Sequence, residues 1–361
     1  MTNRELRPEV KPNAISSERI TAALRAASEL QQNHHVVRVN AEQIGAGQLA
    51  SSFRVYLFYD TEGAGPKTLV AKLPSADAKS FETATRIQAY ARESKFYSLV
   101  RPQLTCNIPR FYGALRNEVG EVVGLLLEDL SDRARPLDQL TDGTVEQVTA
   151  AVNELAALQA PFWDSPVMSR ASWFYNRTQS GEIEGLANRY QVSLSAHQSL
   201  IESSLTSAQR TVVKRFGEQC IKWASEVHSP FTLVHQDFRL DNLLWGSGSV
   251  WIIDWQTLSF GSPAWDLAFL LGTALSWTSR RSAERELVRL HQRNLESLGV
   301  QEWDESKWWM EYRRMSFASL LAMVPAIAFV EQTSRGFEMF ASMISRGAQH
   351  VIDLNALEFL D

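Results

Sequence analysis

Side chains capable of chemistry are concentrated in one short stretch, residues 233–255, which reads LVHQDFRLDNLLWGSGSVWIIDW. Its GSGS turn separates two short apolar runs, so we expect these runs to pair as a β-hairpin. In that hairpin Asn242 faces Ile253, and Asp254 then emerges beside Asn242 at the open end. The loop before the first strand delivers Asp237 to the same place. Two carboxylates and one amide are therefore predicted to converge.

This set of oxygen donors suits a hard divalent cation, because Mg²⁺ prefers oxygen ligands and usually keeps substrate phosphates in its shell. Phosphoryl transfer needs that metal, together with a carboxylate that orients an incoming hydroxyl and accepts its proton. The kinase catalytic loop H-R-D-x-x-x-x-N separates its Asp and Asn by five positions, the same separation as Asp237 and Asn242. An alternative is that such side chains only cap a loop. We favour that alternative for His235 alone, which we expect to support the loop by hydrogen bonding.

A glycine-containing stretch earlier in the chain could hold phosphate groups. Residues 44–55, IGAGQLASSFRV, lie between predicted strands and are rich in small side chains. Gly45 and Gly47 would let backbone N–H groups approach a phosphate, and Ser51 is a further candidate contact. The stretch is not a full G-x-G-x-x-G, because Ala50 occupies the third position, so its phosphate contacts stay open.

A lysine follows on the next predicted strand. Lys72 lies in LVAKL and needs a partner if the strand is half-buried, and Glu93, in the following predicted helix, is the natural one. The kinase plan contains a Lys–Glu pair in this order. The alternative is that Lys72 is a solvated strand residue while Glu93 pairs with Arg92 or Lys95 beside it.

The hydrophobic pattern predicts a strand-rich first third and a helical remainder, which indicates an α+β, bilobal architecture. Thr144 and Gln147 form a plausible capping box, and Gly299 a helix stop. The predicted divisions are an N-terminal extension with a helix at 1–35, a β-rich N-lobe at 36–130 and a helical C-lobe at 131–361. The expected strands are 53–59, 68–73, 110–116 and 122–127, and the expected helices are 16–32, 83–100, 206–226, 264–277, 281–298 and 304–331.

Composition excludes several classes of protein. The net charge of −5 argues against a general binder of nucleic acid or of anionic membranes. The two cysteines, Cys106 and Cys220, form no CxxC pair, so neither a zinc knuckle nor a disulfide framework is indicated. The first residues contain no apolar core of a signal peptide, and the apolar run at 317–330 is short for a membrane span. We therefore expect a cytoplasmic enzyme or binding protein.

The motifs HQDFRLDN, IIDWQ and GSPAWDLAFLLG together resemble those of the aminoglycoside phosphotransferase and choline-kinase-like group, in particular its ecdysteroid-kinase-like branch. The resemblance covers about residues 36–272. It implies a protein-kinase-like fold with a β-rich N-lobe and a helical C-lobe. It also implies an ATP- and Mg²⁺-dependent transfer of the γ-phosphoryl group to a hydroxyl of a small molecule.

Carried over residue by residue, the resemblance implies that Asp237 is the catalytic base and that Asn242 and Asp254 are the Mg²⁺ ligands. Lys72 resembles the lysine on the α- and β-phosphates, and Glu93 resembles its helix partner. The segment LEDL resembles the hinge whose backbone, around Glu128 to Leu130, holds adenine, and Asp266 resembles the acidic residue that braces the catalytic loop.

One residue of the catalytic loop departs from the family motif, and the role of another has two alternative explanations. Gln236 stands where glycine is common. Arg239 lies two residues after Asp237, where protein kinases carry a lysine, and we hypothesise that it stabilises charge on the transferring phosphate. The equal alternative is that Arg239 pairs with Asp241.

Two other classes of protein were weighed. Only twelve residues separate Asp254 from Asp266, which leaves no room for the activation loop and peptide platform of a protein kinase. A small-molecule acceptor is therefore favoured. A catalytically silent, nucleotide-binding pseudokinase or scaffold is the alternative, but such proteins usually lose the lysine, the base or the metal ligand, and this chain retains all of them. The acceptor stays open among aminoglycoside, macrolide, choline-like, sterol and hydroxyacyl compounds, and the oligomeric state is not predicted.

Overall fold

The computed structural model describes residues 15–46, 49–141, 143–177, 180–228, 230–301, 304–329 and 333–361. The chain divides into two compact units. The first unit comprises residues 1–99 and 109–132, and the second comprises residues 100–108 and 133–361. The mixed α and β content, with a sheet in the first unit and helices dominating the second, confirms the predicted α+β class.

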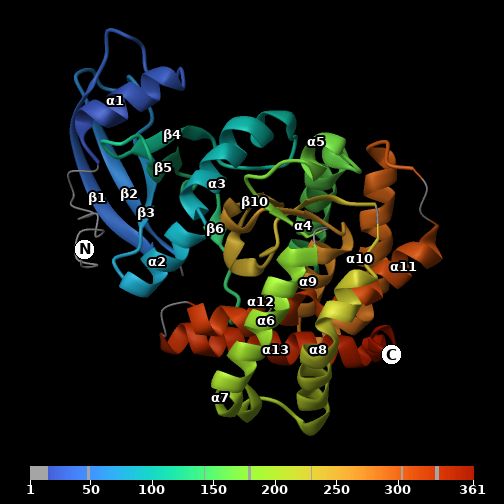
Figure 1. The fold of residues 1–361 in the computed structure, drawn as a ribbon. Coiled ribbons are helices and arrows are strands. Elements are labelled where there is room, and N and C mark those ends of the chain that lie inside the picture. The colour runs from blue at the N-terminus through green and yellow to red at the C-terminus, as the bar shows by residue number, and fades with distance from the viewer. Residues whose placement is uncertain are drawn as a thin grey trace. The chain divides into compact units, whose positions relative to one another are not determined.

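The first unit is built on one five-stranded antiparallel sheet, with the strand order β1-β2-β3-β5-β4 (Figure 1). The strands expected at 53–59 and 68–73 are present and pair with each other as an antiparallel hairpin, with Phe53 opposite Ala71. The strands are β1 (Val36–Ala46), β2 (Ala50–Tyr59), β3 (Thr68–Pro74), β4 (Phe111–Arg116) and β5 (Val122–Glu128).

One face of this sheet is covered by α1 (Ser17–Ala26), which places Ile20 and Leu24 in the same apolar cluster as the buried strand residues. Ser16 caps the helix by accepting a hydrogen bond from the backbone N–H of Arg19. The predicted extension of this helix to residue 32 is wrong, because Ser28 adopts the left-handed conformation with φ 61° and ends it. Leu30 is nevertheless buried in the cluster.

The single helix predicted at 83–100 is also wrong. The segment forms α2 (Ala78–Arg86) and α3 (Ala89–Lys95), followed by a π-helical turn at Phe96–Val100. Gln88 separates the two helices, because its φ of 53° lies in the left-handed region. The break gives α3 its own direction, and this helix carries Glu93.

Two small sheets in the second unit position the catalytic-loop sequence. One sheet has the order β10-β9-β6 and contains the predicted hairpin, in which Val250 pairs with Trp245. The other has the order β7-β11-β8. The strands are β6 (Arg135–Pro136), β7 (Tyr175–Asn176), β8 (Thr232–Val234), β9 (Leu243–Gly246), β10 (Ser249–Ile252) and β11 (Ser259–Gly261).

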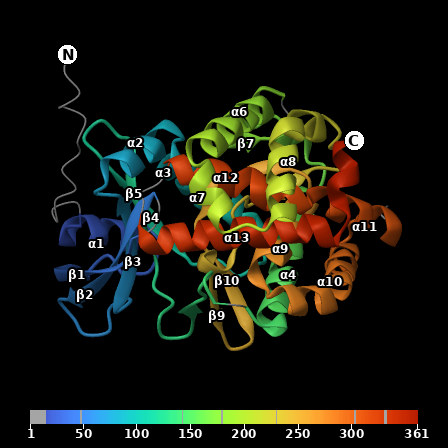
Figure 2. The same cartoon turned by 90° about the horizontal axis from the view of Figure 1, so that it is seen from below.

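The core of the second unit surrounds α9 (Ala264–Ala274), every residue of which is buried. It contacts α4, α12 and α13, and Figure 2 shows α13 as a long red helix that crosses α8. The capping box of Thr144 and Gln147 at the start of α4 is present as predicted. The remaining helices are α4 (Val145–Gln159), α5 (Pro166–Ser169), α6 (Ser180–Ala196), α7 (Gln198–Ser203), α8 (Ser207–Ser225), α10 (Trp277–Ser297), α11 (Glu305–Arg314), α12 (Ala318–Phe329) and α13 (Ser334–Asp353).

Several predicted helix boundaries in this unit were wrong. The helix expected at 264–277 ends at Ala274, and α10 starts at Trp277, because the Ser276 hydroxyl caps it. Gly299, with φ 93°, lies just beyond the end of α10, as predicted for a helix stop. The helix expected at 304–331 is interrupted by a 3₁₀ turn at Met315–Phe317. None of the helices in the described ranges combines the length and apolar character that a membrane span requires.

Candidate active site

The catalytic-loop sequence connects β8 to β9, and its centre is a contact between Asp237 and Asn242. The Asn242 side-chain nitrogen donates to the Asp237 carbonyl oxygen at 2.8 Å and to its Oδ2 at 2.9 Å. A 3₁₀ turn at Leu240–Asn242 reverses the chain and makes this contact possible. The predicted proximity of these two residues is therefore present.

Arg239 lies between two carboxylates of the same loop. Its Nε donates to Asp237 Oδ1 at 2.9 Å, and its Nη1 donates to Asp241 Oδ2 at 2.7 Å. The predicted alternative, an Arg239–Asp241 pair, is confirmed, and Asp237 shares the same guanidinium. Burial disfavours the charged guanidinium, but the two carboxylates outweigh it and raise the pKa of Arg239. The arginine is therefore a fixed positive charge beside Asp237.

A second arginine and a backbone amide hold Asp241 in turn. Arg335, near the start of α13, donates to Asp241 Oδ1 at 3.0 Å and to Asp138 Oδ1 at 2.7 Å. The backbone N–H of Gln139 donates to the same Asp241 oxygen at 2.8 Å. Burial opposes ionisation of Asp241, but Arg239 and these donors keep its pKa below the ordinary value. Nothing in the local sequence spacing indicated that Arg335 and Gln139 would reach this loop.

The hairpin brings the backbone of Asp254 beside Asn242. The N–H of Ile253 donates to the Asn242 carbonyl oxygen at 3.1 Å, so the pairing predicted for these two residues is present. Asp254 follows with φ 69°, a left-handed conformation that carries the chain out of the strand. His235 Nε2 lies 3.0 Å from the Ile253 carbonyl oxygen. The supporting role predicted for His235 is thus consistent with its contacts.

Asp266, at the start of α9, braces the loop through two backbone amides. Its Oδ2 accepts from the His235 N–H at 2.7 Å and its Oδ1 from the Gln236 N–H at 2.9 Å. Burial raises the pKa of the Asp266 carboxyl to about 7 despite these two amides, and the Asp237 charge adds to the rise. Gln236 has φ 70°, which explains why glycine would be easier to accommodate there.

In the first unit, Lys72 and Glu93 form the predicted ion pair. Lys72 Nζ lies 3.0 Å from Glu93 Oε1 and 2.8 Å from Oε2. Lys72 is 8% exposed and Glu93 is 0% exposed, so the pair is almost fully withdrawn from water. A buried charge pair of this kind contributes little net stability compared with apolar residues, which favours a functional reason for retaining it.

The other predicted nucleotide contacts of the first unit lie at strand ends. Gly45, near the end of β1, pairs with Ser52, and Ser51 pairs with Ala46 and Leu73. A Cβ at Gly45 would touch only Ser52, at 4.0 Å, so the backbone there is open to approach. Gly47 lies outside the described residues.

The predicted hinge follows β5. Glu128 ends that strand, and its backbone N–H donates to the Arg110 carbonyl oxygen at 2.9 Å. Leu130 is buried. Between them, Asp129 forms a 2.7 Å ion pair with Arg54 on β2, a contact that the sequence reasoning missed. This ion pair connects the predicted hinge segment to β2 of the sheet.

The donor set fits Mg²⁺. Because the Asn242 nitrogen is used on Asp237, its Oδ1 is left as a donor to a cation, and no described residue bonds to it. Asp254 adds a carboxylate next to the same hairpin end. Within the described ranges, no group of three or more His, Cys, Asp or Glu residues could hold a metal by itself. Any ion here would therefore complete its shell with phosphate oxygens or water.

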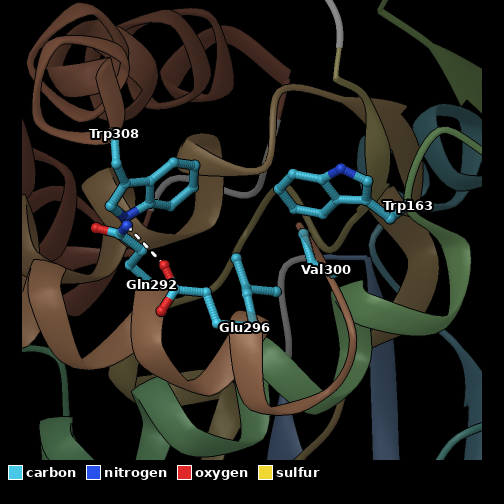
Figure 3. A pocket seen from close by; sticks show the side chains of 6 residues that line it. Trp163, Gln292, Glu296, Val300 and Trp308 are labelled. Atoms are coloured by element: carbon cyan, nitrogen blue, oxygen red, sulfur yellow. Dashed lines mark hydrogen bonds between the residues drawn. The ribbon is translucent and has the colours of Figure 1, made fainter. Parts of the chain in front are cut away.

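A small gap beside α10 is too small for a substrate (Figure 3). Its volume is about 10 Å³, room for at most one water molecule. Trp163 and Trp308 face it, with Gln292 donating to Glu296 at 2.8 Å below them. Trp308 is 1% exposed and stacks on His291, so it is a core residue rather than part of a cage for a cationic ligand.

The chain is similar in fold to several solved structures. A choline kinase from Cryptosporidium parvum Iowa II is 12% identical, with a TM-score of 0.60 and coverage of 96% of this chain and 98% of that one. A macrolide 2'-phosphotransferase from Brachybacterium faecium is 15% identical, with a TM-score of 0.52 and coverage of 91% and 98%. A putative aminoglycoside phosphotransferase from Ralstonia eutropha is 13% identical, with a TM-score of 0.51 and coverage of 94% and 98%.

Similarity at the level of sequence is seen with a family rather than with individual proteins. No curated protein sequence matches this chain. Residues 41–309 match the phosphotransferase enzyme family, APH, and this range contains the Lys72–Glu93 pair and the whole catalytic loop. The predicted resemblance is confirmed: the chain belongs to the phosphotransferase enzyme family.

Proposed function

We propose that this protein transfers the γ-phosphoryl group of ATP to a hydroxyl of a small molecule, with Mg²⁺ as cofactor. The observation that carries the proposal is the Asp237–Asn242 contact. One amide group fixes the carboxylate through its nitrogen and keeps its oxygen for a cation. A purely structural role would not require the Asn242 oxygen to stay available beside a further carboxylate such as Asp254.

In this proposal Asp237 orients the acceptor hydroxyl and accepts its proton. The acceptor oxygen bonds to the γ-phosphorus as the bond from that phosphorus to the β–γ bridging oxygen breaks, and ADP leaves. Asn242 and Asp254 would hold Mg²⁺, which neutralises charge on the phosphates when bound. Arg239 holds Asp237 in place and adds a positive charge near the transferring group.

The proposed nucleotide contacts belong to the first unit. Lys72, held by Glu93, would bind the α- and β-phosphates, and the backbone around Glu128 to Leu130 would bind adenine. Gly45, Gly47 and Ser51 would approach the phosphates. The proposed roles are nucleotide binding for residues 36–130 and catalysis for residues 131–361. An aminoglycoside 2'-phosphotransferase of similar fold, with a TM-score of 0.53 and 13% identity, was solved as a GDP complex. This complex supports the proposal that the present chain binds a nucleotide.

The test is Mg²⁺-dependent consumption of ATP by the purified chain, with a panel of hydroxyl compounds. The panel spans aminoglycosides, macrolides, choline, sterols and hydroxyacyl compounds. Turnover that requires one acceptor class and is lost in Asp237→Ala would support the proposal. Absence of any Mg·ATP binding by the folded chain would contradict it.

A further inference from the structure

An open pocket of about 390 Å³ lies at the start of α6 in the second unit. It is lined by Tyr175, Gly181, Glu182, Gly185 and Arg189. Its volume is within the range of small-molecule sites, in contrast to the gap beside α10. The strand β7, which carries Tyr175, supplies the other wall.

Two glycines leave one face of α6 without side chains. Gly181, Gly185 and Arg189 are spaced four residues apart, so they share one face of the helix. A Cβ at Gly181 would meet no atom within 4 Å, and one at Gly185 would meet only Arg189 Nη1, at 3.5 Å. Glycine inside a helix is destabilising relative to alanine, and no close packing requires it here. The open face is therefore better explained by a ligand than by the fold.

This pocket is connected to the catalytic loop through Arg177. The Arg177 guanidinium lies 4.6 Å from the centre of the Tyr175 ring, and its Nη2 donates to Gln236 Oε1 at 2.8 Å. Gln236 immediately precedes Asp237. The backbone N–H of Arg177 also donates to the Phe260 carbonyl oxygen at 2.8 Å, which holds the segment against β11. A molecule in the pocket would thus contact Tyr175 and Glu182, which both contact Arg177, and Arg177 bonds to the neighbour of the proposed base.

One carboxylate, on Glu182, and two guanidinium groups, on Arg189 in the lining and on Arg177 beside Tyr175, give the pocket region a net positive charge. Arg177 Nη1 forms an ion pair with Glu182 at 3.2 Å, so the single carboxylate of the pocket is already compensated. Arg189 is exposed, and its guanidinium makes no hydrogen bond or ion pair within the described ranges. A cationic ligand would therefore meet an uncompensated arginine and no free carboxylate. An anionic ligand would be bound by charge-assisted hydrogen bonds from a guanidinium.

We propose that this pocket binds the anionic group, a phosphate or a carboxylate, of a hydroxyl-bearing acceptor. The inference rests on the proposed function for the statement that the bound molecule is the acceptor. It narrows the acceptor class toward hydroxylated acids and phosphomonoesters and away from polyamines. The apolar ring of Tyr175 would contact the carbon skeleton between the anion and the hydroxyl.

Binding is measured first without nucleotide, by ligand-observed NMR on the whole chain. The probes are glycerol 3-phosphate and glycerate, which differ in the anion, together with glycerol, which is neutral, and choline, which is cationic. At least one of the two anions is expected to bind, and glycerol and choline are not. Comparison of the two anions then distinguishes a phosphate site from a carboxylate site.

Three variants test the role of the pocket. Arg189→Gln is expected to weaken anion binding by roughly tenfold to a hundredfold, because a charge-assisted hydrogen bond is lost. Arg293→Gln makes the same change on the exposed surface of α10 and is expected to leave binding unaltered. Gly185→Leu is expected to weaken binding without lowering the melting temperature, because leucine favours the helix while its side chain fills the pocket.

The outcomes separate this inference from the proposed function. Choline binding in preference to both anions, no anion binding in the millimolar range, or unchanged binding in Arg189→Gln would overturn the inference and leave phosphotransfer standing. Anion binding by a chain that does not bind Mg·ATP would overturn the proposed function and retain the anion site. With an active acceptor, Arg189→Gln is expected to raise KM more than it lowers kcat, since Arg189 binds the part of the acceptor away from the reacting oxygen.

Discussion

The side-chain nitrogen of Asn242 donates to both the carbonyl oxygen and the Oδ2 of Asp237, at 2.8 and 2.9 Å. These two bonds make Asn242 an orienting residue for the carboxylate, and they turn its own oxygen toward other partners. The two residues are five positions apart, and the 3₁₀ turn between them sets the contact. Loop geometry, the proposed cation binding and the position of the proposed base therefore all depend on this one pair of residues.

Asn242→Asp is expected to lower turnover by at least about a hundredfold, because it replaces the donor with a second carboxylate close to Asp237. Mg²⁺-dependent ATP consumption measures the effect. Asn294→Asp is the matched control, since the Asn294 side chain donates to Asn153 on the exposed surface of α10. Equal turnover in Asn242→Asp and Asn294→Asp would show that the contact does not serve catalysis.

Lys72→Met is expected to lower the free energy of unfolding by about 3–5 kcal/mol, because it leaves the buried Glu93 carboxylate without its ammonium partner. Chemical denaturation measures this change. The double variant Lys72→Met with Glu93→Leu is expected to recover most of the stability, since neither charge is then buried.

Measurements of nucleotide binding distinguish a structural role of the Lys72–Glu93 pair from a role in binding phosphate. Both the single and the double variant are expected to bind Mg·ATP at least about tenfold more weakly, because the phosphate contact is lost in each. If the double variant regained both stability and nucleotide affinity, the pair would be structural only.

Arg239→Lys is expected to remain at least about tenfold below the original turnover. A lysine keeps the charge, but it cannot bridge Asp237 and Asp241 with the planar fork that forms the 2.9 and 2.7 Å bonds. Arg335→Gln, which removes the outer contacts to Asp241 and Asp138 and leaves Arg239 in place, is expected to have a smaller effect. An Arg239→Ala variant with unchanged turnover would rule out a role for this arginine in the reaction.

Protein stability is expected to depend on pH through Asp266. Its folded-state pKa of about 7 lies above the ordinary value of 3.8, so the folded chain binds the proton more tightly than the unfolded chain does. The associated stability is fully present below pH 3.8 and is lost as pH rises through about 7. Between pH 5 and pH 8 the loss amounts to roughly 2 to 3 kcal/mol.

Asp266→Asn removes this titration while retaining one oxygen acceptor for the loop. The difference in unfolding free energy between the original chain and the variant is therefore expected to shrink as pH rises from 5 to 8. Denaturant unfolding at four or five pH values measures this difference. A constant difference across the range would mean that Asp266 does not titrate there.

Local patterns predicted the parts of the site that depend on nearby residues. The hairpin that pairs Val250 with Trp245 follows from the spacing and alternation of nearby residues. The Thr144 capping box was also predicted from nearby residues, because its two partners lie three residues apart. Such features are set by short stretches of chain. The Lys72–Glu93 pair spans 21 positions and was predicted from the kinase plan rather than from a local pattern.

Local patterns did not predict the features that depend on distant residues or on unusual backbone conformations. The left-handed Gln88 divides one expected helix into two, and nothing in its side chain demands that conformation. Arg335 reaches Asp241 across 94 positions, and Arg177 reaches Gln236 across 59. The bounds of helices α6, α7 and α13 were not predicted, although α13 packs on α8 and α9. These contacts are set by tertiary packing, which periodicity within one segment does not report.

The most direct test of the central claim follows the γ-phosphoryl group itself. The whole chain is incubated with Mg²⁺, γ-labelled ATP and the acceptor panel, and Asp237→Asn is run in parallel. The proposed phosphoryl transfer requires that label appear on an acceptor hydroxyl in equal amount to the ADP formed, and that Asp237→Asn abolish this transfer. Label released only as inorganic phosphate, or transferred equally by Asp237→Asn, would contradict it.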